Sequence, residues 1–387
     1  MQFVDLAAQQ RKISTQIEKN IHTVLSHGKY IMGPEVQELE NKLGAYVGAK
    51  FAIGCSSGTD ALLLALMAYN IGPGDVIFTT PFTFIATAEV ICLLGATPVF
   101  VDIDEKTFNI HPEKLLQAIS ALKSRDYTKH PLPDIKDPAF LKPKGIIAVD
   151  LFGLPAEYDQ INKIAGEHGL FVIEDAAQSF GAEYKGRKAC TLADIACTSF
   201  FPAKPLGCYG DGGMCFTNNE NVAEIVRSLS VHGKGLHKYD NIRIGLNGRL
   251  DTLQAAILLA KISIFREENS LRQDVARRYT EFLSVYPSIQ TPVTPEDLKS
   301  AWAQYSILLK DKEARDSIQI KLKTAGIPSA IYYPKPLHIQ KAFSFLGHKK
   351  RDFPVSEDCS NRILSLPMHP YLTVKEQARI ARIIGNV

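Results

Sequence analysis

The 387-residue sequence lacks a strong excess of either charge. It contains 44 Lys and Arg residues against 41 Asp and Glu residues, and its formal net charge is +3. No basic block stands out, because Lys/Arg-rich pieces such as 348–351 are short and typical of solvated loops. Proteins that bind nucleic acid carry clustered Lys and Arg on one face. We therefore expect no nucleic-acid partner.

Clustered cysteines and long apolar runs are also missing. The seven cysteines show no C-x-x-C spacing, and Cys92, Cys197 and Cys215 lie in apolar runs. This pattern indicates reduced core thiols in a cytoplasmic protein, and predicts neither a disulfide framework nor a zinc or other metal site. No apolar run reaches the ~20 residues of a membrane-spanning helix, and residues 1–5 lack the pattern of a signal peptide. We expect no membrane contact.

What the sequence does contain is an alternation of strand-like and helix-like segments. Short apolar runs that predict strands lie at 51–55, 75–80, 97–101, 145–152, 170–174, 195–201 and 213–217. Segments with helical spacing of apolar residues separate most of them, the first being Ile13 to Leu25. This alternation predicts an α/β fold with a doubly wound, mostly parallel sheet.

The length predicts more than one domain. We divide the chain into an N-terminal arm (1–12), a large domain (13–255), and a long linking helix with a smaller C-terminal domain (256–387). Within the large domain, residues 123–144 are polar and carry four prolines, which predicts an inserted surface loop. Because this loop leads into the start of a strand, we expect it on the side of the sheet opposite the catalytic strand ends.

One lysine stands in an unusual setting. Lys204 lies among aromatic residues, prolines and glycines in the stretch 199–213, with no neighbouring charge until Asp211. Desolvation there disfavours the ammonium form, lowers the pKa and leaves a nucleophilic amine. Such a lysine suits a Schiff base with a carbonyl compound or with pyridoxal 5′-phosphate (PLP). The alternative is a Gly-rich surface turn with a stray lysine.

A carboxylate follows a buried strand nearby in the sequence. Residues 171–175 form an apolar run that ends in Asp175, and Gln178 comes three residues later. Open α/β sheets bind ligands at the carboxyl ends of their strands. PLP needs a carboxylate partner for its pyridinium nitrogen, which Asp175 would supply. The alternative for Asp175 is an N-cap of a following helix.

A third segment suits an anion. Ser57, Gly58 and Thr59 join a strand to an apolar helix, so their N–H groups and hydroxyls would face a phosphate at the helix N-terminus. An ordinary helix cap explains the same residues equally well. Phe84, in the segment 81–87, is placed to stack on a planar cofactor, although a lone Phe is more often part of the core.

These stretches carry a family resemblance. The pattern Ser199-Phe-Phe-Pro-Ala-Lys-Pro-Leu-Gly-Cys-Tyr-Gly-Asp-Gly-Gly213 resembles the lysine motif of the DegT/DnrJ/EryC1/StrS sugar aminotransferases. The resemblance extends along the chain, from Phe3-Val-Asp-Leu6 to Leu366-Pro-Met-His-Pro-Tyr371. It implies a fold-type I PLP-dependent aminotransferase, with a mostly parallel seven-stranded sheet in a large domain and a smaller α+β C-terminal domain.

The resemblance also implies a role for each matching residue. Lys204 would form the Schiff base with PLP and move the proton during amino transfer. The other implied cofactor contacts are Asp175 at the ring nitrogen, Gln178 at the ring hydroxyl, Phe84 on the ring face, Ser57, Gly58, Thr59 and Ser199 at the phosphate, and Asn247 reaching the phosphate from the partner subunit. A homodimer with shared active sites follows. The implied substrate contacts are Arg249, Tyr332, Tyr333 and His338.

Within the family, the shared motifs resemble the UDP-2-acetamido-2-deoxy-3-oxo-glucuronate 3-aminotransferases of O-antigen and capsule synthesis. That subgroup implies a nucleotide-sugar substrate and L-glutamate as donor, with 2-oxoglutarate as product. The chain has Tyr332-Tyr333-Pro334 where the subgroup commonly has His-Tyr-Pro. Alternatives are amination of a 4-keto sugar or of a dTDP- or GDP-linked 3-keto-6-deoxy sugar, a PLP-dependent dehydratase, disfavoured because Lys204 is present, and a non-enzymatic sensor.

Overall fold

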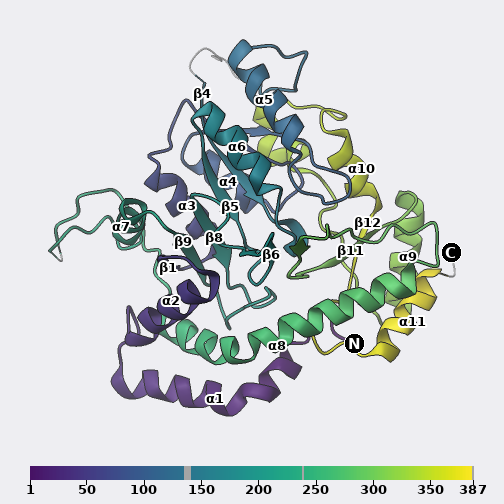
Figure 1. Cartoon of the computed structure of the whole chain (residues 1–387), viewed down its shortest axis with the longest axis horizontal. Helices are drawn as coiled ribbons and strands as arrows, with labels where there is room; N and C mark the ends of the chain where they lie inside the picture. Colours follow the sequence, from purple (N-terminus) through teal and green to yellow (C-terminus); the bar gives the residue numbers. More distant parts are fainter. Residues whose placement is uncertain (135–140, 238, 386–387) are drawn as a thin grey trace.

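A computed structural model of the chain describes residues 1–134, 141–237 and 239–385. Its centre is a seven-stranded sheet of order β1-β9-β8-β5-β4-β2-β3 (Figure 1). The strands are β1 (Phe51–Cys55), β2 (Asp75–Thr79), β3 (Thr97–Phe100), β4 (Lys142–Val149), β5 (Phe171–Asp175), β8 (Ile195–Ser199) and β9 (Gly213–Thr217). Neighbouring strands from β8 to β3 pair in parallel, whereas β9 is antiparallel to both β8 and β1. The predicted α/β fold with a mostly parallel sheet is confirmed.

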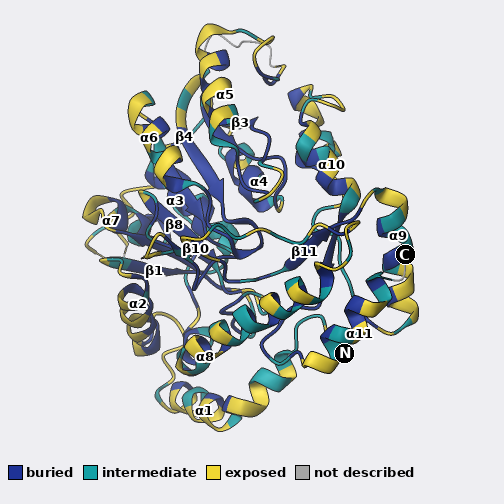
Figure 2. Ribbon diagram, turned by 45° about the vertical axis from the view of Figure 1, so that its right-hand side comes forward, coloured by how far each residue is buried: buried dark blue, intermediate teal, exposed yellow. Residues whose placement is uncertain are grey.

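Helices cover both faces of this sheet. They are α2 (Pro34–Val47), α3 (Gly58–Ala68), α4 (Ala86–Leu93), α5 (Pro112–Ser124), α6 (Tyr158–His168), α7 (Glu220–Leu229) and α8 (Thr252–Leu283), while α1 (Leu6–His27) packs on the outside of α8. Ile173 and Ile195 pack with α3, α4 and α7, whereas their neighbours Val172 and Ala196 face α5, α6, α2 and α8. Burial on both faces explains the continuous apolar runs of the central strands, which are dark blue in Figure 2.

The long helix α8 joins the two halves of the molecule. Its first part, with Ala255 and Leu258, packs on the large sheet, and its last part, with Val275 and Tyr279, enters a second core. That core contains an antiparallel pair of strands, β11 (Tyr305–Leu308) and β12 (Ile363–Leu366), with helices α9 (Lys312–Thr324), α10 (Pro354–Arg362) and α11 (Val374–Gly385). A second, three-stranded sheet connects the segment after β5 with the start of the C-terminal part. Its strands are β6 (Glu183–Tyr184), β7 (Arg187–Lys188) and β10 (Leu298–Lys299).

The first helix begins earlier than the sequence periodicity predicted. Helix α1 starts at Leu6, so residues 6–12 are helical and only the first five residues precede the helix. The Asp5 carboxylate caps it by accepting from the Ala8 N–H at 2.9 Å. Asp is a favoured N-cap and the segment that follows is rich in good helix formers. Residues 6–12 of the predicted N-terminal arm are therefore the first part of α1.

The predicted loop over 123–144 is shorter at both ends. Helix α5 extends to Ser124 and β4 begins at Lys142, while residues 135–140 lie outside the described residues. The chain enters β4 at Lys142, which is the end of that strand away from Asp150 and Asp175. No helix in the described ranges is long and apolar enough to cross a membrane.

Candidate active site

The loop between β8 and β9 holds Lys204 by backbone hydrogen bonds. The Phe200 N–H donates to the Gly212 carbonyl at 2.8 Å, and the Cys208 N–H donates to the Phe200 carbonyl at 2.7 Å. Gly207 is required there, because a Cβ atom would lie 2.5 Å from the Pro202 carbonyl oxygen. The loop therefore presents Lys204 from a closed, well-bonded turn.

Lys204 is partly buried, and no hydrogen-bond acceptor contacts its ammonium among the described residues. Burial lowers the pKa of Lys204, and the negative charge of Asp175 partly opposes that shift. The lowering by burial was expected from the sequence, whereas the opposing effect of Asp175 comes from the fold. The covalent role of Lys204 stays a prediction.

Asp175 ends β5, in register with Val149 of β4 and Cys197 of β8. Its Oδ2 accepts from the Thr87 hydroxyl at 2.8 Å, and its Oδ1 accepts from the Ala177 N–H at 3.2 Å. Burial raises the pKa of Asp175, whereas these two hydrogen bonds and Lys204 lower it. Turns rather than a helix follow Asp175, so the helix-cap alternative is wrong.

Gln178 lies between the sheet and the C-terminal half. Its Oε1 accepts from the Phe152 N–H at 2.6 Å, and its Nε2 donates to the Tyr333 hydroxyl at 3.4 Å. The Phe84 ring lies 6.5 Å from the Tyr333 ring, between centroids, and 56% of Phe84 is exposed. A large exposed aromatic beside polar groups is not a core residue, so Phe84 is free to cover a planar ligand.

The predicted phosphate turn is brought against the end of β8. Ser57 is the N-cap of α3, and its Oγ accepts from the Asp60 N–H at 3.0 Å. A Cβ atom on Gly58 would lie 2.6 Å from the Ser199 Cβ, so only glycine lets the helix and the strand end approach this closely. The first N–H groups of α3, including that of Thr59, have no intrahelical acceptor and point outward from the helix. Ser57 thus serves as a cap while the turn also suits an anion.

The segment before α8 passes beside this turn. Arg249 forms an antiparallel bridge with Cys55, and the Ser56 N–H donates to the Gly248 carbonyl at 3.1 Å. The Nε of Arg249 is buried and has no hydrogen-bond partner among the described residues. An unpaired buried guanidinium nitrogen near a phosphate-sized turn fits an anionic group bound there. Asn247 is exposed nearby, bridged to Val231.

His338 was predicted to contact the substrate, and that role stays a prediction. Its side chain is buried, with Nε2 3.1 Å from Glu357 Oε1 and its ring 4.8 Å from the Phe353 ring between centroids. Pro-rich neighbours suggested an exposed mouth, but the imidazole packs inward. Tyr332 stays partly exposed, with its ring 6.2 Å from that of Phe3.

Sequence reasoning missed two features beside the site. One is Thr87, which donates to the Asp175 carboxylate, and the other is a buried carboxyl pair, Glu174 within β5 and Asp150 directly after β4. Thr87 gave only a weak sequence signal, a hydroxyl one turn after Thr83. Asp150 closes β4 in the way that Asp175 closes β5, a parallel that the sequence does show.

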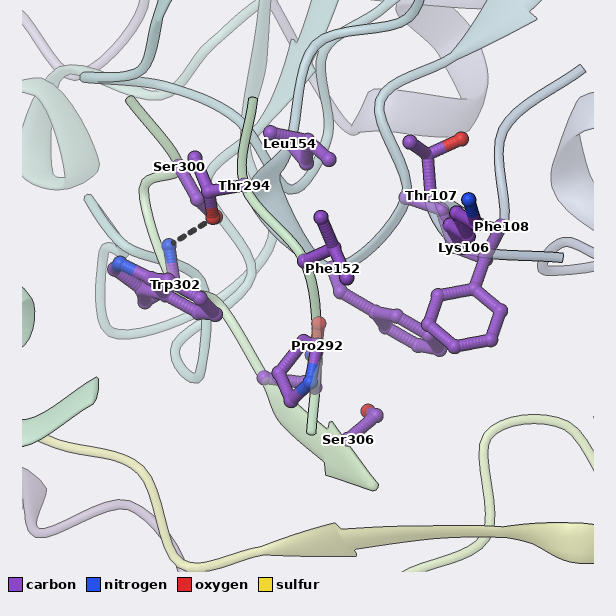
Figure 3. A pocket seen from close by; sticks show the side chains of 13 residues that line it. Lys106, Thr107, Phe108, Phe152, Leu154, Pro292, Thr294, Ser300, Trp302 and Ser306 are labelled. Atoms are coloured by element: carbon purple, nitrogen blue, oxygen red, sulfur yellow. Dashed lines mark hydrogen bonds between the residues drawn. The ribbon is translucent and has the colours of Figure 1, made fainter. Parts of the chain in front are cut away.

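A small hollow opens elsewhere, between the large and C-terminal parts. It is lined by residues that include Phe108, Phe152, Pro292, Trp302 and Ser306 (Figure 3). None of the predicted site residues lines it. We therefore place the site by its chemistry, at the strand ends that carry Lys204 and Asp175, and not at this hollow.

The assembled residues fit PLP. An anion-binding turn, a carboxylate for a protonated ring nitrogen, an amine of lowered pKa and an exposed aromatic ring are the contacts that a phosphorylated pyridine aldehyde needs. The residues that would hold it come from β5, β8, α3 and the 81–87 segment. The unpaired Nε of Arg249 lies beside the end expected to hold the phosphate.

Comparison with known proteins agrees with this geometry. The chain is 47% identical to a UDP-2-acetamido-2-deoxy-3-oxo-D-glucuronate aminotransferase from Pseudomonas aeruginosa, over 96% of each chain. A crystal structure of a DegT/DnrJ/EryC1/StrS aminotransferase from Brucella abortus superposes with a TM-score of 0.92 at 48% identity, over 99% of this chain and 98% of that one. A Bacillus subtilis protein solved with bound PMP cofactor has a TM-score of 0.85 at 30% identity, over 96% and 81%. The sequence model of one protein family matches residues 11–385 of the chain. The chain therefore belongs to that family, the DegT/DnrJ/EryC1/StrS aminotransferases.

Proposed function

We propose that the protein transfers an amino group from L-glutamate to the keto group of a nucleotide-linked sugar, with PLP as cofactor. The observation that carries this proposal is the placement of Lys204. Its ammonium is partly buried, has no hydrogen-bond acceptor among the described residues, and lies close enough to Asp175 for the negative charge of that carboxylate to act on it. Membership of an aminotransferase family supports the same reaction.

When bound, PLP supplies an electron sink that stabilises negative charge developing at the carbon next to the transferred nitrogen. Asp175 would hold its ring nitrogen by an ion pair, and the α3 turn with Ser199 and Arg249 would hold its phosphate. Phe84 would cover one ring face and exclude water from it. Gln178, fixed by the Phe152 N–H, would present its amide to the ring hydroxyl.

Lys204 performs the proton transfers. A lysine whose pKa is lowered by burial is neutral in a larger fraction of molecules at neutral pH, so its Nζ can accept the α-proton of the amino donor. The same Nζ, once protonated, would be the acid that gives the proton back, so one side chain would serve as both base and acid. Because donor and acceptor use one site in turn, we expect ping-pong kinetics.

We propose the 3-keto group of a UDP-2-acetamido-2-deoxy-3-oxo-hexuronate as the acceptor. The name of the Pseudomonas aeruginosa relative supports this choice. Tyr332 and Tyr333, which border the site, are the proposed sugar contacts, with Arg249 shared between sugar and phosphate. The 3-amino sugar would serve O-antigen or other polysaccharide synthesis. A 4-keto nucleotide sugar is the competing acceptor.

We also propose that the enzyme works as a homodimer in the cytoplasm. Asn247 is exposed and bridged to Val231 just after α7, and we assign it to the phosphate turn of the partner subunit. The seven cysteines are all free, as expected for a reducing compartment.

The proposal is tested by absorbance spectroscopy of PLP-loaded wild type and Lys204→Ala. We expect the wild type to show a near-visible band that glutamate alone converts to the pyridoxamine form, with one 2-oxoglutarate released per site. We expect the alanine variant to lose this conversion by at least about a thousandfold in rate, because it has no base for the α-proton. Lys42→Ala, on the exposed face of α2, serves as control.

Either of two results would overturn the assignment. One is a wild type without a Schiff-base band, and the other is an unchanged conversion rate in Lys204→Ala. The pyridoxamine-loaded enzyme is then offered 3-keto and 4-keto UDP-sugars, and the sugar that regenerates the starting band identifies the acceptor.

A further inference from the structure

A chain of hydroxyl groups leads to the catalytic carboxylate. The Thr83 and Thr87 hydroxyl oxygens lie 3.0 Å apart, and the Thr87 hydroxyl lies 2.8 Å from Asp175 Oδ2. All three side chains are buried. None of the roles assigned above uses the two threonines.

The direction of these hydrogen bonds follows from chemistry. An ionised carboxylate only accepts, so Thr87 must donate its single hydroxyl proton to Asp175. Thr87 then has only lone pairs left for Thr83, and Thr83 must donate. Each bond in such a chain polarises the next, so the bond that reaches Asp175 is strengthened.

The two threonines lie at the entry to one helix. Thr87 is in the first turn of α4, where its N–H donates to the Phe84 carbonyl at 3.3 Å, and Thr83 lies four residues earlier, in the bend that precedes the helix. One segment therefore carries both the aromatic ring that faces the cofactor and the hydroxyl that contacts its carboxylate partner.

We propose that Thr87, backed by Thr83, is a positioning residue that keeps the Asp175 carboxylate ionised and turned toward the ring nitrogen of the cofactor. This inference rests on the proposed function for the identity of the ring nitrogen. Its effect on Asp175 itself is a property of the protein alone.

Other groups act on the same carboxylate. Lys204 faces Asp175 from the β8–β9 loop and favours its ionised form, as does the Ala177 N–H. Tyr333, Tyr158 and Cys197 also lie within its electrostatic reach, from the 331–338 segment, α6 and β8, and their pKa values are raised by burial with a contribution from Asp175. At neutral pH these three are uncharged, so Lys204 and the hydrogen bonds decide the state of Asp175.

The test measures Asp175 in cofactor-free protein. Protein labelled with ¹³C at the aspartate carboxyl carbons is titrated by NMR, and the Asp175 signal is the one missing from Asp175→Asn. We expect Thr87→Val, which keeps the shape but removes the hydroxyl, to raise the pKa of Asp175 by about one unit, a tenfold change in its ionisation constant. Thr87→Ser restores the hydroxyl and should restore the pKa. Thr83→Val should give a smaller rise.

Thr79→Val is the matched control. Thr79 is equally buried, and its hydroxyl donates to the Ile147 carbonyl at 3.0 Å instead of to a carboxylate. It should lose stability without changing the Asp175 titration. An unchanged pKa of Asp175 in folded Thr87→Val, or a rise of equal size in Thr79→Val, overturns the proposal.

Binding of PLP provides the second readout. At pH 7.5 we expect Thr87→Val to bind PLP about tenfold more weakly than wild type, and Thr87→Ser to bind within about twofold of it. Affinity that is unchanged in Thr87→Val overturns the orientation part of the proposal. Failure of wild type to bind PLP would refute the proposed function, and the carboxyl titration would still decide whether Thr87 controls Asp175.

Discussion

Two carboxyl groups of the central strands are fully buried, Glu174 within β5 and Asp150 directly after β4. Asp150 Oδ2 accepts from the Ser179 hydroxyl at 2.7 Å, and its Oδ1 accepts from the Tyr158 hydroxyl at 2.8 Å. Burial raises the pKa of Asp150 to about 7, and burial together with Asp150 raises the pKa of Glu174. The pair therefore retains protons near neutral pH that the unfolded chain has lost.

This retention sets the pH dependence of stability. The folded chain binds more protons than the unfolded chain between the ordinary pKa of Asp150, 3.8, and about 7. Stability from this source is complete below pH 4 and is lost as the pH rises through 7. We expect the free energy of unfolding to fall by up to about 4 kcal/mol across this window, at about 1.4 kcal/mol per pH unit. Urea titrations at several pH values measure it.

Asp150→Asn separates this effect from other titrations. The amide cannot ionise and still accepts hydrogen bonds, so we expect the stability of this variant to change much less between pH 5 and 8. Asp297→Asn, at an exposed position, is the control and should keep the wild-type profile. A wild-type stability that rises with pH over this range would contradict the assignment.

At the scale of elements, the buried carboxylate of Glu40 connects α2 with β1 and α7 by hydrogen bonds. Glu40 of α2 accepts from the Gly54 N–H of β1 and from Arg227 Nη1 of α7, both at 2.9 Å. Arg227 Nη2 also donates to the Ala52 carbonyl at 2.9 Å. Glu40 is nearly fully buried, so its loss would leave the Gly54 N–H and Arg227 Nη1 without their acceptor.

We expect Glu40→Ala to lower the free energy of unfolding by about 2 to 3 kcal/mol, because both donors lose a buried acceptor. The control comes from the same helix. Glu38 pairs with Lys42 on the exposed face, and Glu38→Ala should cost less than about 0.5 kcal/mol. Equal losses in the two variants, by urea denaturation, would show that burial of the Glu40 pair does not matter.

The elements also show what the sequence could and could not predict. Apolar runs predicted the central strands because a strand buried on both faces consists of consecutive apolar residues. The antiparallel direction of β9 was not predicted, since the spacing of apolar residues does not show in which direction two strands pair. The early start of α1 depended on the Asp5 cap, and β6, β7 and β10 are each too short to show alternation.

The residues of the candidate site could also be predicted only in part from the sequence. Lys204 and Asp175 stood out because a lysine among glycines and a carboxylate after a buried strand are chemically unusual. The position of Arg249 beside the phosphate turn depends on its bridge to Cys55, a long-range contact that local sequence patterns do not show. Thr87 was missed because buried threonines are common, and the burial of His338 was not predicted because local composition does not report which way a side chain packs.

At the scale of the whole molecule, one segment projects from the large domain. Between α7 and α8 the chain runs outward beyond α7 (Figure 1) and returns, held by bonds such as Ile242 N–H to the Gly233 carbonyl at 2.9 Å. Leu236 is 95% exposed and Ile244 is 91% exposed on it. A hydrogen-bonded arm that displays large apolar side chains is typical of a surface covered by another protein molecule.

The proposed occupant is a second copy of the chain, because the same arm leads to Asn247 and Arg249 at the site. We expect wild type to sediment as a dimer at micromolar concentration, and Leu236→Asp with Ile244→Asp to raise the dimer dissociation constant at least tenfold, since two buried apolar contacts become charged. Ile320→Asp, which changes an exposed apolar residue on α9, is the control and should leave the dimer intact. If the arm delivers Asn247 to the partner's phosphate turn, the double variant should also lose PLP affinity in step with dissociation. A wild type that sediments as a monomer, or a double variant that stays dimeric, would exclude the arm as the dimer contact.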